Sequence, residues 1–398
     1  MIPLSQVKYQ PELTRTFLGS PSVVRLPDNS LVVSHDYYGV GCPRNQESEE
    51  SLTSIYRSED NGATWVNITH IMNCYWSTLF YHNGALYIFG TSQQYGSIVI
   101  RRSDDGGYTW THPTVDKPEN GWLFGGGFYH DGPNYHCAPV AVTIHNGRIY
   151  KAFEDCTPCV WGTGFQACVV SAPVDADLLD AKNWTMSNKL PYDPAWVPKE
   201  WGRTLKPGWR EGNVVADLDG QLWDIMTFEA GPLEQEYSAR IKIEDDGKKI
   251  TFDPSKDYFT LPGCKAKLTI RRDPVSGEYL TIGNALDSHE ILRKWAQEGD
   301  DSFTRFHKDH SMRQRNRTYV LASKDLWNWR RVKLLLQDES GLKAEDSIRL
   351  TGFQYTDWQF DGNNDIIFAV RTAYRGAANF HDANRIYYGT IPNFRDLL

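Results

Sequence analysis

Histidine and arginine residues far apart in the chain are the side chains best suited to chemistry. His35 ends an apolar run and His136 begins one, while Arg210 and Arg371 stand in comparable places farther along. An imidazole transfers protons near neutral pH because its ordinary pKa is about 6.5, and a guanidinium can hold a carboxylate or a developing negative charge. These residues predict proton transfer on an anionic substrate, provided that the fold brings them together.

A repeated octapeptide indicates which fold could do so. Residues 58–65 and 103–110 share the pattern Ser-x-Asp-x-Gly-x-Thr-Trp, and weaker versions stand at 180–184 and 323–329. Asp and Gly favour a tight turn, and the Trp can pack beneath it. The pattern resembles the Asp box of sialidase-like propellers, and its recurrence after about 45 residues predicts blades of that size.

A second repeat, a short polar turn before an alternating apolar strand, predicts the hairpin between the first two strands of a blade. We count six such turns: Asp28-Asn29, His82-Asn83-Gly84, His145-Asn146-Gly147, Asp219-Gly220, Ser276-Gly277 and Asp361-Gly362. The sequence therefore predicts an all-β chain, a single β-propeller over residues 1–398 with four-stranded antiparallel blades. A polar insertion at about 287–315 is expected to be a loop or a short helix.

Strand direction predicts which residues share a face. In a propeller, the start of each first strand and the end of each second strand lie together, opposite the Asp boxes. His82 and His145 then belong to the opposite face. The predicted catalytic residues are His35, His136 and Arg210. The predicted substrate-binding residues are Tyr37, Tyr38, Trp76, Asn213, Arg349, Arg371 and His381.

Composition narrows the functional class. The net charge of -8 is dispersed, and no Lys/Arg run or long apolar segment indicates a nucleic-acid or membrane partner. N-glycosylation sequons at Asn67, Asn183 and Asn316 slightly favour a secreted protein. The expected form is the mature protein without a signal peptide. Seven cysteines, including Cys156-x-x-Cys159, leave a metal cluster, a disulfide and ordinary buried thiols all open.

Several segments together resemble the propeller enzymes that split rhamnose–glucuronate bonds, a group that includes ulvan lyases and exo-acting L-rhamnose-α-1,4-D-glucuronate lyases. The segments are Val33–Gly39, Tyr135–Pro139, Asp177–Leu179, Asn183–Thr185, Glu211–Asn213, Phe353–Tyr355 and His381–Asn384. The resemblance implies a seven-bladed propeller, a polysaccharide or glycoprotein glycan such as gum arabic as substrate, and a structural calcium in the central channel. No cofactor is implied for the chemistry.

The resemblance also implies residue roles. His35 matches the catalytic histidine of the rhamnose-releasing members, and His136 matches the one that acts with a Tyr and an Arg in ulvan lyases. Where those lyases read roughly Asn-Ile-Leu-Arg, this chain has Asp224–Thr227 with a terminal Thr. This departure favours the exo-acting branch, which releases L-rhamnose by syn β-elimination.

Three other functions remain open. Asp36, Glu211 and Asp382 could supply the two carboxylates of a hydrolysing α-L-rhamnosidase. The Asp boxes suggest a sialidase, although the Arg-Ile-Pro segment expected near the N-terminus is absent. A carbohydrate-binding propeller without catalysis is the alternative from another class, because a fold does not fix a function.

Overall fold

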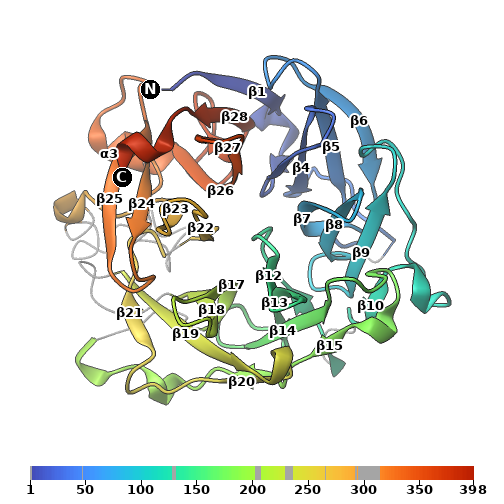
Figure 1. Cartoon of the computed structure of the whole chain (residues 1–398). Coiled ribbons are helices and arrows are strands. Elements are labelled where there is room, and N and C mark those ends of the chain that lie inside the picture. The colour runs from blue at the N-terminus through green and yellow to red at the C-terminus, as the bar shows by residue number, and fades with distance from the viewer. Residues whose placement is uncertain are drawn as a thin grey trace.

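Six antiparallel sheets stand around a central axis as the blades of one propeller (Figure 1). The computed structural model describes residues 2–46, 48–127, 131–201, 208–228, 236–264, 266–291, 294 and 314–398. In each blade the strands follow the chain from the axis outward, except that the N-terminal β1 is the outermost strand of the last blade, and neighbouring strands are antiparallel. The predicted all-β propeller is confirmed.

Named from the innermost strand outward, the first blade contains β2 (Phe17–Leu18) and β3 (Ser22–Arg25), β4 (Leu31–Tyr38), β5 (Thr53–Ser58) and β6 (Val66–Ile71), and the second contains β7 (Tyr75–His82), β8 (Ala85–Thr91), β9 (Ile98–Ser103) and β10 (Trp122–Phe124). The third blade contains β11 (Tyr135–His136) and β12 (Thr143–His145), β13 (Arg148–Cys156), β14 (Phe165–Pro173), β15 (Thr185–Met186) and β16 (Leu190–Pro191), and the fourth contains β17 (Arg210–Ala216), β18 (Leu222–Thr227), β19 (Tyr237–Glu244), β20 (Lys249–Thr251) and β21 (Tyr258–Thr260). The fifth blade contains β22 (Arg271–Arg272), β23 (Tyr279–Gly283), β24 (Arg317–Ser323) and β25 (Trp329–Gln337), and the last contains β26 (Gly352–Asp361), β27 (Asp365–Ala373), β28 (Arg385–Ile391) and β1 (Leu4–Tyr9).

Helical segments are short and lie between strands. The α-helix α3 (Ala344–Leu350) precedes β26. The 3-10 turns are η1 (Glu12–Thr14), η2 (Pro118–Asn120), η4 (Ala181–Asn183), η5 (Pro194–Trp196), η6 (Lys199–Trp201), η7 (Asp245–Gly247) and η8 (Phe394–Leu397). None of the helices in the described ranges is long and apolar enough to cross a membrane.

The ring closes through the N-terminus. Strand β1 pairs with β28 and so completes the last blade, while β2 pairs with β4 in the first blade. The six blades counted from the sequence are therefore confirmed for the described residues. The seventh blade implied by the resemblance is wrong there, because residues 4–18 add strands to two existing blades.

Apolar packing fills each of the six interfaces between neighbouring blades. Strands alternate their side chains between two faces, so each blade buries one face against the blade before it and the other against the blade after it. One cluster joins Val33 of the first blade to Ile367 of the last, while Val32 belongs to a cluster shared with Ile88 of the second blade. The other four interfaces are filled in the same way. This closed ring of contacts fixes the directions of all the strands.

The repeated turns form as predicted. In the first Asp box the Ser58 hydroxyl donates to Asp60 and accepts from the Gly62 amide, and the Trp65 indole donates to the Gly62 carbonyl. The second box makes the same bonds with Ser103, Asp105, Gly107 and Trp110. All six polar turns lie between the first two strands of a blade. The positions expected for these turns from the sequence are confirmed.

Two further predictions have different outcomes. The insertion at about 287–315 falls between β23 and β24, but residues 295–313 lie outside the described residues. The single-domain boundary of 1–398 stays a prediction. All seven cysteines lie in the described part of the chain, none of them forms a disulfide, and Cys159 is the exposed one. Of the three alternatives for cysteine, unbridged thiols are the one that the structure has.

Candidate active site

A cavity of about 200 Å³ opens at the end of the propeller where the innermost strands begin. Trp76 of β7, His136 of β11, Glu211 of β17 and Tyr355 of β26 each enter it from the start of such a strand. Arg371 enters from the end of β27, a second strand. The predicted meeting of strand starts and strand ends therefore occurs, and it makes a pocket.

Three of these side chains are each oriented by a β-bulge in their own strand. Trp76, Glu211 and Tyr355 have φ angles of 45°, 56° and 54°, in the left-handed region. Each stands where the pairing register of its innermost strand shifts. Bulky residues rarely adopt this conformation, and each such residue costs on the order of 1–3 kcal/mol. Three equivalent bulges around one cavity indicate that these side chains are held in place for a function.

Buried carboxylates from the neighbouring blade hold two of the bulges. Asp36 of β4 accepts a hydrogen bond from the Trp76 amide at 3.1 Å, and Glu154 of β13 accepts one from the Gly212 amide at 3.0 Å. Burial raises the pKa of Asp36 to about 7, although the bonds from Thr53 and Trp76 oppose the rise. The strain is thus balanced by a charged or polar anchor behind each bulge.

His136 is the side chain in the cavity that is best placed to accept a proton. Its Nδ1 lies 2.7 Å from Oε2 of the fully buried Glu154, so Nδ1 carries the proton and donates it to that carboxylate. The ring packs between Trp76, with centroids 4.3 Å apart, and Phe165, at 4.9 Å. Nε2 has no protein partner among the described residues and keeps a free lone pair. Glu154 also stabilises the imidazolium that forms when Nε2 takes a proton.

Arg371 is the cation of the cavity. Its Nη2 donates to the Tyr38 hydroxyl at 2.6 Å and to the His381 carbonyl at 2.7 Å. The guanidinium lies over the rings of Tyr38 and Tyr355, at 4.7 and 5.0 Å from their centroids. Burial opposes the charge, but Tyr38 and Tyr355 raise the pKa of Arg371, so it stays cationic. Nη1 has no bond to a described residue and is available to an anion.

Burial shifts the pKa of both His381 and Tyr38. Burial and the nearby Arg371 hold the pKa of His381 well below its usual value, against the effect of Asp382, 2.9 Å from Nδ1. Burial raises the pKa of Tyr38 above its usual range. His381 is therefore neutral at pH 7, and Tyr38 keeps its phenolic proton as a hydrogen-bond donor.

Two carboxylates line the cavity. Glu50 accepts bonds from the Tyr75 hydroxyl, the Gly39 amide and Arg44, so both of its oxygens are occupied. Glu211 lines the opposite wall from its bulge, and no hydrogen bond from a described residue fixes its carboxylate. Of these two carboxylates, Glu211 is therefore the one that is free to act on a ligand.

Five of the ten predicted site residues line this cavity: His136, Tyr38, Trp76, Arg371 and His381. The opposite-face assignment of His82 and His145 also agrees with the structure, because both stand at turns between first and second strands. The other five predicted residues are placed elsewhere, and their predicted roles stay untested.

The expected position of His35 in the pocket is wrong. Alternate residues Val33 and Tyr37 of β4 face the last blade, and His35 follows the same alternation. Its ring packs against Tyr37 and Tyr56, at 4.8 and 5.4 Å, and its Nε2 is buried without a hydrogen bond. Burial lowers the pKa of His35 to about 4, so the ring is neutral packing between blades.

The remaining four do not line the pocket. Tyr37 is buried beside His35 and accepts a bond from Ser54. Arg210 stacks its guanidinium on the Trp161 ring at 5.5 Å, and it therefore supports a wall of the cavity from behind. Asn213 accepts the Ile270 amide at 2.6 Å and so ties two blades together. Arg349 belongs to α3, not to the innermost strand expected for it.

Glu154 and Tyr355 are among the residues that the predicted set lacks, and Glu211 was considered only as a carboxylate of a hydrolase. Glu154 lies near the end of β13, as His35 and Arg371 lie near the ends of their strands, and it pairs directly with His136 across the sheet. This strand position could have indicated Glu154 from the sequence. The bulges at Glu211 and Tyr355 have no such sequence signal, because neither position carries the Gly or Asn that usually marks a left-handed residue.

Metal ligands do not gather at the site in the part of the chain that the structure describes. Among the described residues, no three His, Cys, Asp or Glu side chains are grouped as metal ligands would be. The structural calcium that the resemblance implies for the central channel stays a prediction.

Comparison with known proteins gives structural neighbours only. Neither protein-family models nor curated protein sequences match the chain. Among solved structures, an α-L-arabinanase of Penicillium chrysogenum complexed with arabinobiose matches with a TM-score of 0.55 and 15% identity, over 98% of this chain and 97% of that one. An α-L-arabinofuranosidase of Fusarium graminearum matches with a TM-score of 0.56 and 11% identity, over 100% of this chain and 98% of that one. A Hadza microbial sialidase matches with a TM-score of 0.59 and 12% identity, over 98% of this chain and 68% of that one. At these identities the comparisons show the shared propeller fold.

Proposed function

We propose that this chain is a carbohydrate-active enzyme, an exo-acting lyase that removes terminal L-rhamnose from α-1,4-linked D-glucuronate. The observation that carries the proposal is His136, oriented by Glu154 at 2.7 Å, in the same cavity as the cationic Arg371. The glycan-cleaving names of the structural neighbours support a carbohydrate substrate by analogy. A cavity of about 200 Å³ suits one terminal sugar ring better than a long chain segment.

The first step is neutralisation of the glucuronate carboxylate. The C5 hydrogen becomes acidic only when negative charge can spread onto that carboxylate. Nη1 of Arg371 is free to bind it, while the Tyr38 hydroxyl accepts from Nη2 of Arg371 and donates to the His381 carbonyl at 2.8 Å, which holds the guanidinium in place. Donors arranged in advance in a dry site favour the charge of the transition state over that of the bound substrate.

The second step is proton transfer. Nε2 of His136 takes the C5 proton, the C5–H electron pair forms the C4=C5 double bond, and the C4–O4 bond breaks toward oxygen. The C5 hydrogen and O4 lie on the same side of the D-glucuronate ring. The imidazolium can therefore return its proton to the leaving oxygen. Rhamnose leaves with that oxygen, a 4,5-unsaturated glucuronate remains, and no water is consumed.

A hydrolysing α-L-rhamnosidase is the second candidate, because Glu50 and Glu211 both line the cavity. Hydrolysis requires two carboxylates, usually one as the acid and one as the base or nucleophile. Glu50 is already bound by Tyr75, Gly39 and Arg44, which favours a structural anion over a proton donor. The elimination route uses groups that are free in the structure, and we prefer it for that reason.

The test is incubation of the protein with gum arabic, followed by analysis of the released sugar and of the new chain end. Rhamnose together with an ultraviolet-absorbing unsaturated uronate supports the lyase. Rhamnose with an intact glucuronate end supports the hydrolase. Binding of the glycan without any release supports a carbohydrate-binding propeller. The proposal also includes secretion, since such a glycan is extracellular.

A further inference from the structure

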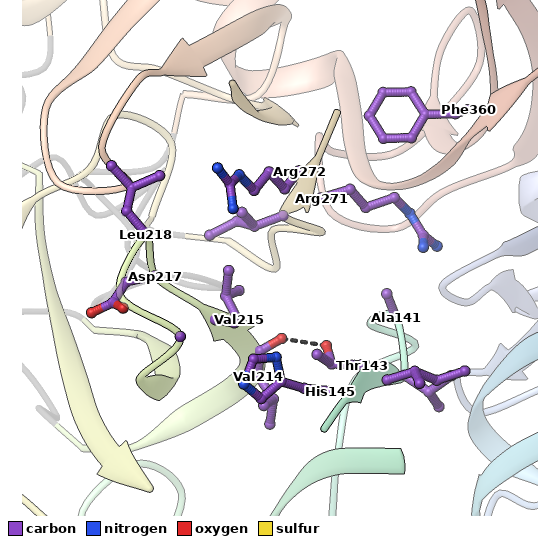
Figure 2. Close-up of a pocket in the computed structure, with 15 residues that line it drawn as sticks. Ala141, Thr143, His145, Val214, Val215, Asp217, Leu218, Arg271, Arg272 and Phe360 are labelled. Carbon is purple, nitrogen blue, oxygen red and sulfur yellow. Dashed lines mark hydrogen bonds between the residues drawn. The ribbon is translucent and has the colours of Figure 1, made fainter. Parts of the chain in front are cut away.

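A second cavity, of about 410 Å³, lies at the other end of the innermost strands (Figure 2). It is lined by β12, by the end of β17 with its following turn, by β22 and by Phe360 of β26. The candidate active site lies where these strands begin, so this cavity is at the opposite mouth of the central channel. The groups that line it have no part in the proposed cleavage.

Two guanidinium groups in this cavity lack a carboxylate partner among the described residues. Nε of Arg271 donates to the Trp358 carbonyl at 2.7 Å, and no other hydrogen bond or ion pair to Arg271 occurs within the described residues. Nε of Arg272 donates to the Gly277 carbonyl at 3.0 Å and likewise has no acidic partner there. Burial lowers the pKa of Arg271, against the attraction of the nearby Asp357. Arg271 is only partly exposed and forms no ion pair with a described residue, so an anionic ligand would improve the solvation of its charge.

The acidic groups around the cavity are already engaged. Asp217 accepts from the backbone amides of Asp219 and Gln221 and from the Trp223 indole. Asp357 attracts the charge of Arg271 from behind, but its carboxylate is bound by the Ser22 hydroxyl and the Val23 amide. The terminal nitrogens of Arg271 therefore keep their capacity for an external anion.

The remaining walls suit a sugar ring. Figure 2 shows Arg271 and Arg272 on one side of the cavity and Ala141, Thr143 and His145 on the other. Val215 and Phe360 add apolar surface, on which the C–H face of a pyranose can pack. Nε2 of His145 is buried without a hydrogen-bond partner among the described residues, and the imidazole forms part of the cavity wall.

We propose that this cavity is a second glycan-binding site, specific for a uronate unit of an acidic polysaccharide. Arg271 binds the uronate carboxylate, Phe360 and Val215 contact the ring, and Arg272 extends the positive surface toward the next unit. This site would hold the polymer while the candidate active site at the opposite mouth of the channel cleaves a chain end. It stands on its own lining residues and does not depend on whether cleavage is elimination or hydrolysis.

The test is a binding titration with D-glucuronate, observed by NMR of the ligand, with D-glucose as the neutral control. All measurements use the full chain carrying Arg371→Gln, so that the cation of the other cavity is absent. We expect this background to bind glucuronate and not glucose. Adding Arg271→Gln is expected to weaken binding about tenfold to a hundredfold, because a charge-assisted contact is lost. Arg102→Gln, on an outer hairpin where Arg102 pairs with Asp104, serves as the matched control and should change nothing.

Two results would overturn the second site. One is an Arg371→Gln background that does not bind glucuronate. The other is an Arg271→Gln variant that melts normally and binds as tightly as its background. If Arg271→Gln lowers the melting temperature, the exposed Arg272→Gln variant decides, and unchanged binding there also counts against the site. Because the experiment measures only binding, its result tests the second site even if the protein does not cleave the proposed substrate.

Discussion

Replacing Glu154 by glutamine tests how His136 is made into a base. The carboxylate accepts from Nδ1 of His136 at 2.7 Å and from the Gly212 amide at 3.0 Å. A glutamine side chain has one oxygen for these two donors, and its NH₂ group faces the other one. The imidazole is then pushed into the tautomer with its proton on Nε2, where it cannot accept the C5 proton.

The size of the effect follows from the two bonds. A hydrogen bond to a charged group contributes about 1.5–3 kcal/mol, and the bond to His136 strengthens further when the imidazolium forms. Together with the tautomer change, this predicts that kcat falls about 10² to 10⁴-fold, with a smaller change in KM because Glu154 does not contact substrate. Glu154 is fully buried, so water cannot replace the missing oxygen.

The assay is release of rhamnose and of unsaturated uronate from gum arabic, measured for the parent, Glu154→Gln and His136→Gln. His82→Gln is the control, because His82 stands on the opposite face and contacts the Val174 carbonyl. Thermal melting of all four proteins separates a catalytic loss from unfolding. A folded Glu154→Gln protein with kcat within threefold of the parent, or a large loss in His82→Gln, would refute this role of Glu154.

Three further predictions concern the site and its supports. The pKa of His35 is about 6.5 in the unfolded chain and about 4 in the folded one, so the free energy of unfolding should fall by about 3 kcal/mol as the pH falls from 6.5 to 4. His35→Gln should lose this pH dependence in denaturant titrations, and an unchanged pH profile would count against burial of the ring. Gly212→Ala should lower the free energy of unfolding by about 1–3 kcal/mol, because the added Cβ would collide with the Asp224 carboxylate; a melting temperature equal to the parent's would contradict the close packing. Arg371→Lys should lower kcat/KM about 10²-fold or more, since one ammonium cannot replace the planar group that binds Tyr38, His381 and a carboxylate together; retained activity would remove Arg371 from the carboxylate site.

The blades could be predicted because their signals are local. The Asp boxes at 58–65 and 103–110 and the six polar turns each depend on neighbouring residues. Once strand directions are fixed, strand starts and strand ends must meet, and this geometry correctly predicts that His136 and Arg371 share one cavity. The number of blades implied by the resemblance was less reliable than the count of turns in the chain itself.

The direction of single side chains was harder to predict. Within β4 the change of one position moves a side chain from one face of the blade to the other, and this sends His35 into the packing with the last blade. The bulges at Trp76, Glu211 and Tyr355 arise from tertiary contacts such as that of Asp36 with the Trp76 amide. No local pattern predicts these bulges, which is why Tyr355 was missed and Glu211 was considered only as a hydrolase carboxylate.

The most direct test of elimination at His136 is proton NMR of a gum arabic digest followed in time. Elimination predicts that the vinylic proton of the unsaturated glucuronate rises in a one-to-one ratio with free rhamnose, and that both signals disappear in His136→Gln. Rhamnose that accumulates while the glucuronate keeps its C5 hydrogen, or equal product from His136→Gln, would contradict it.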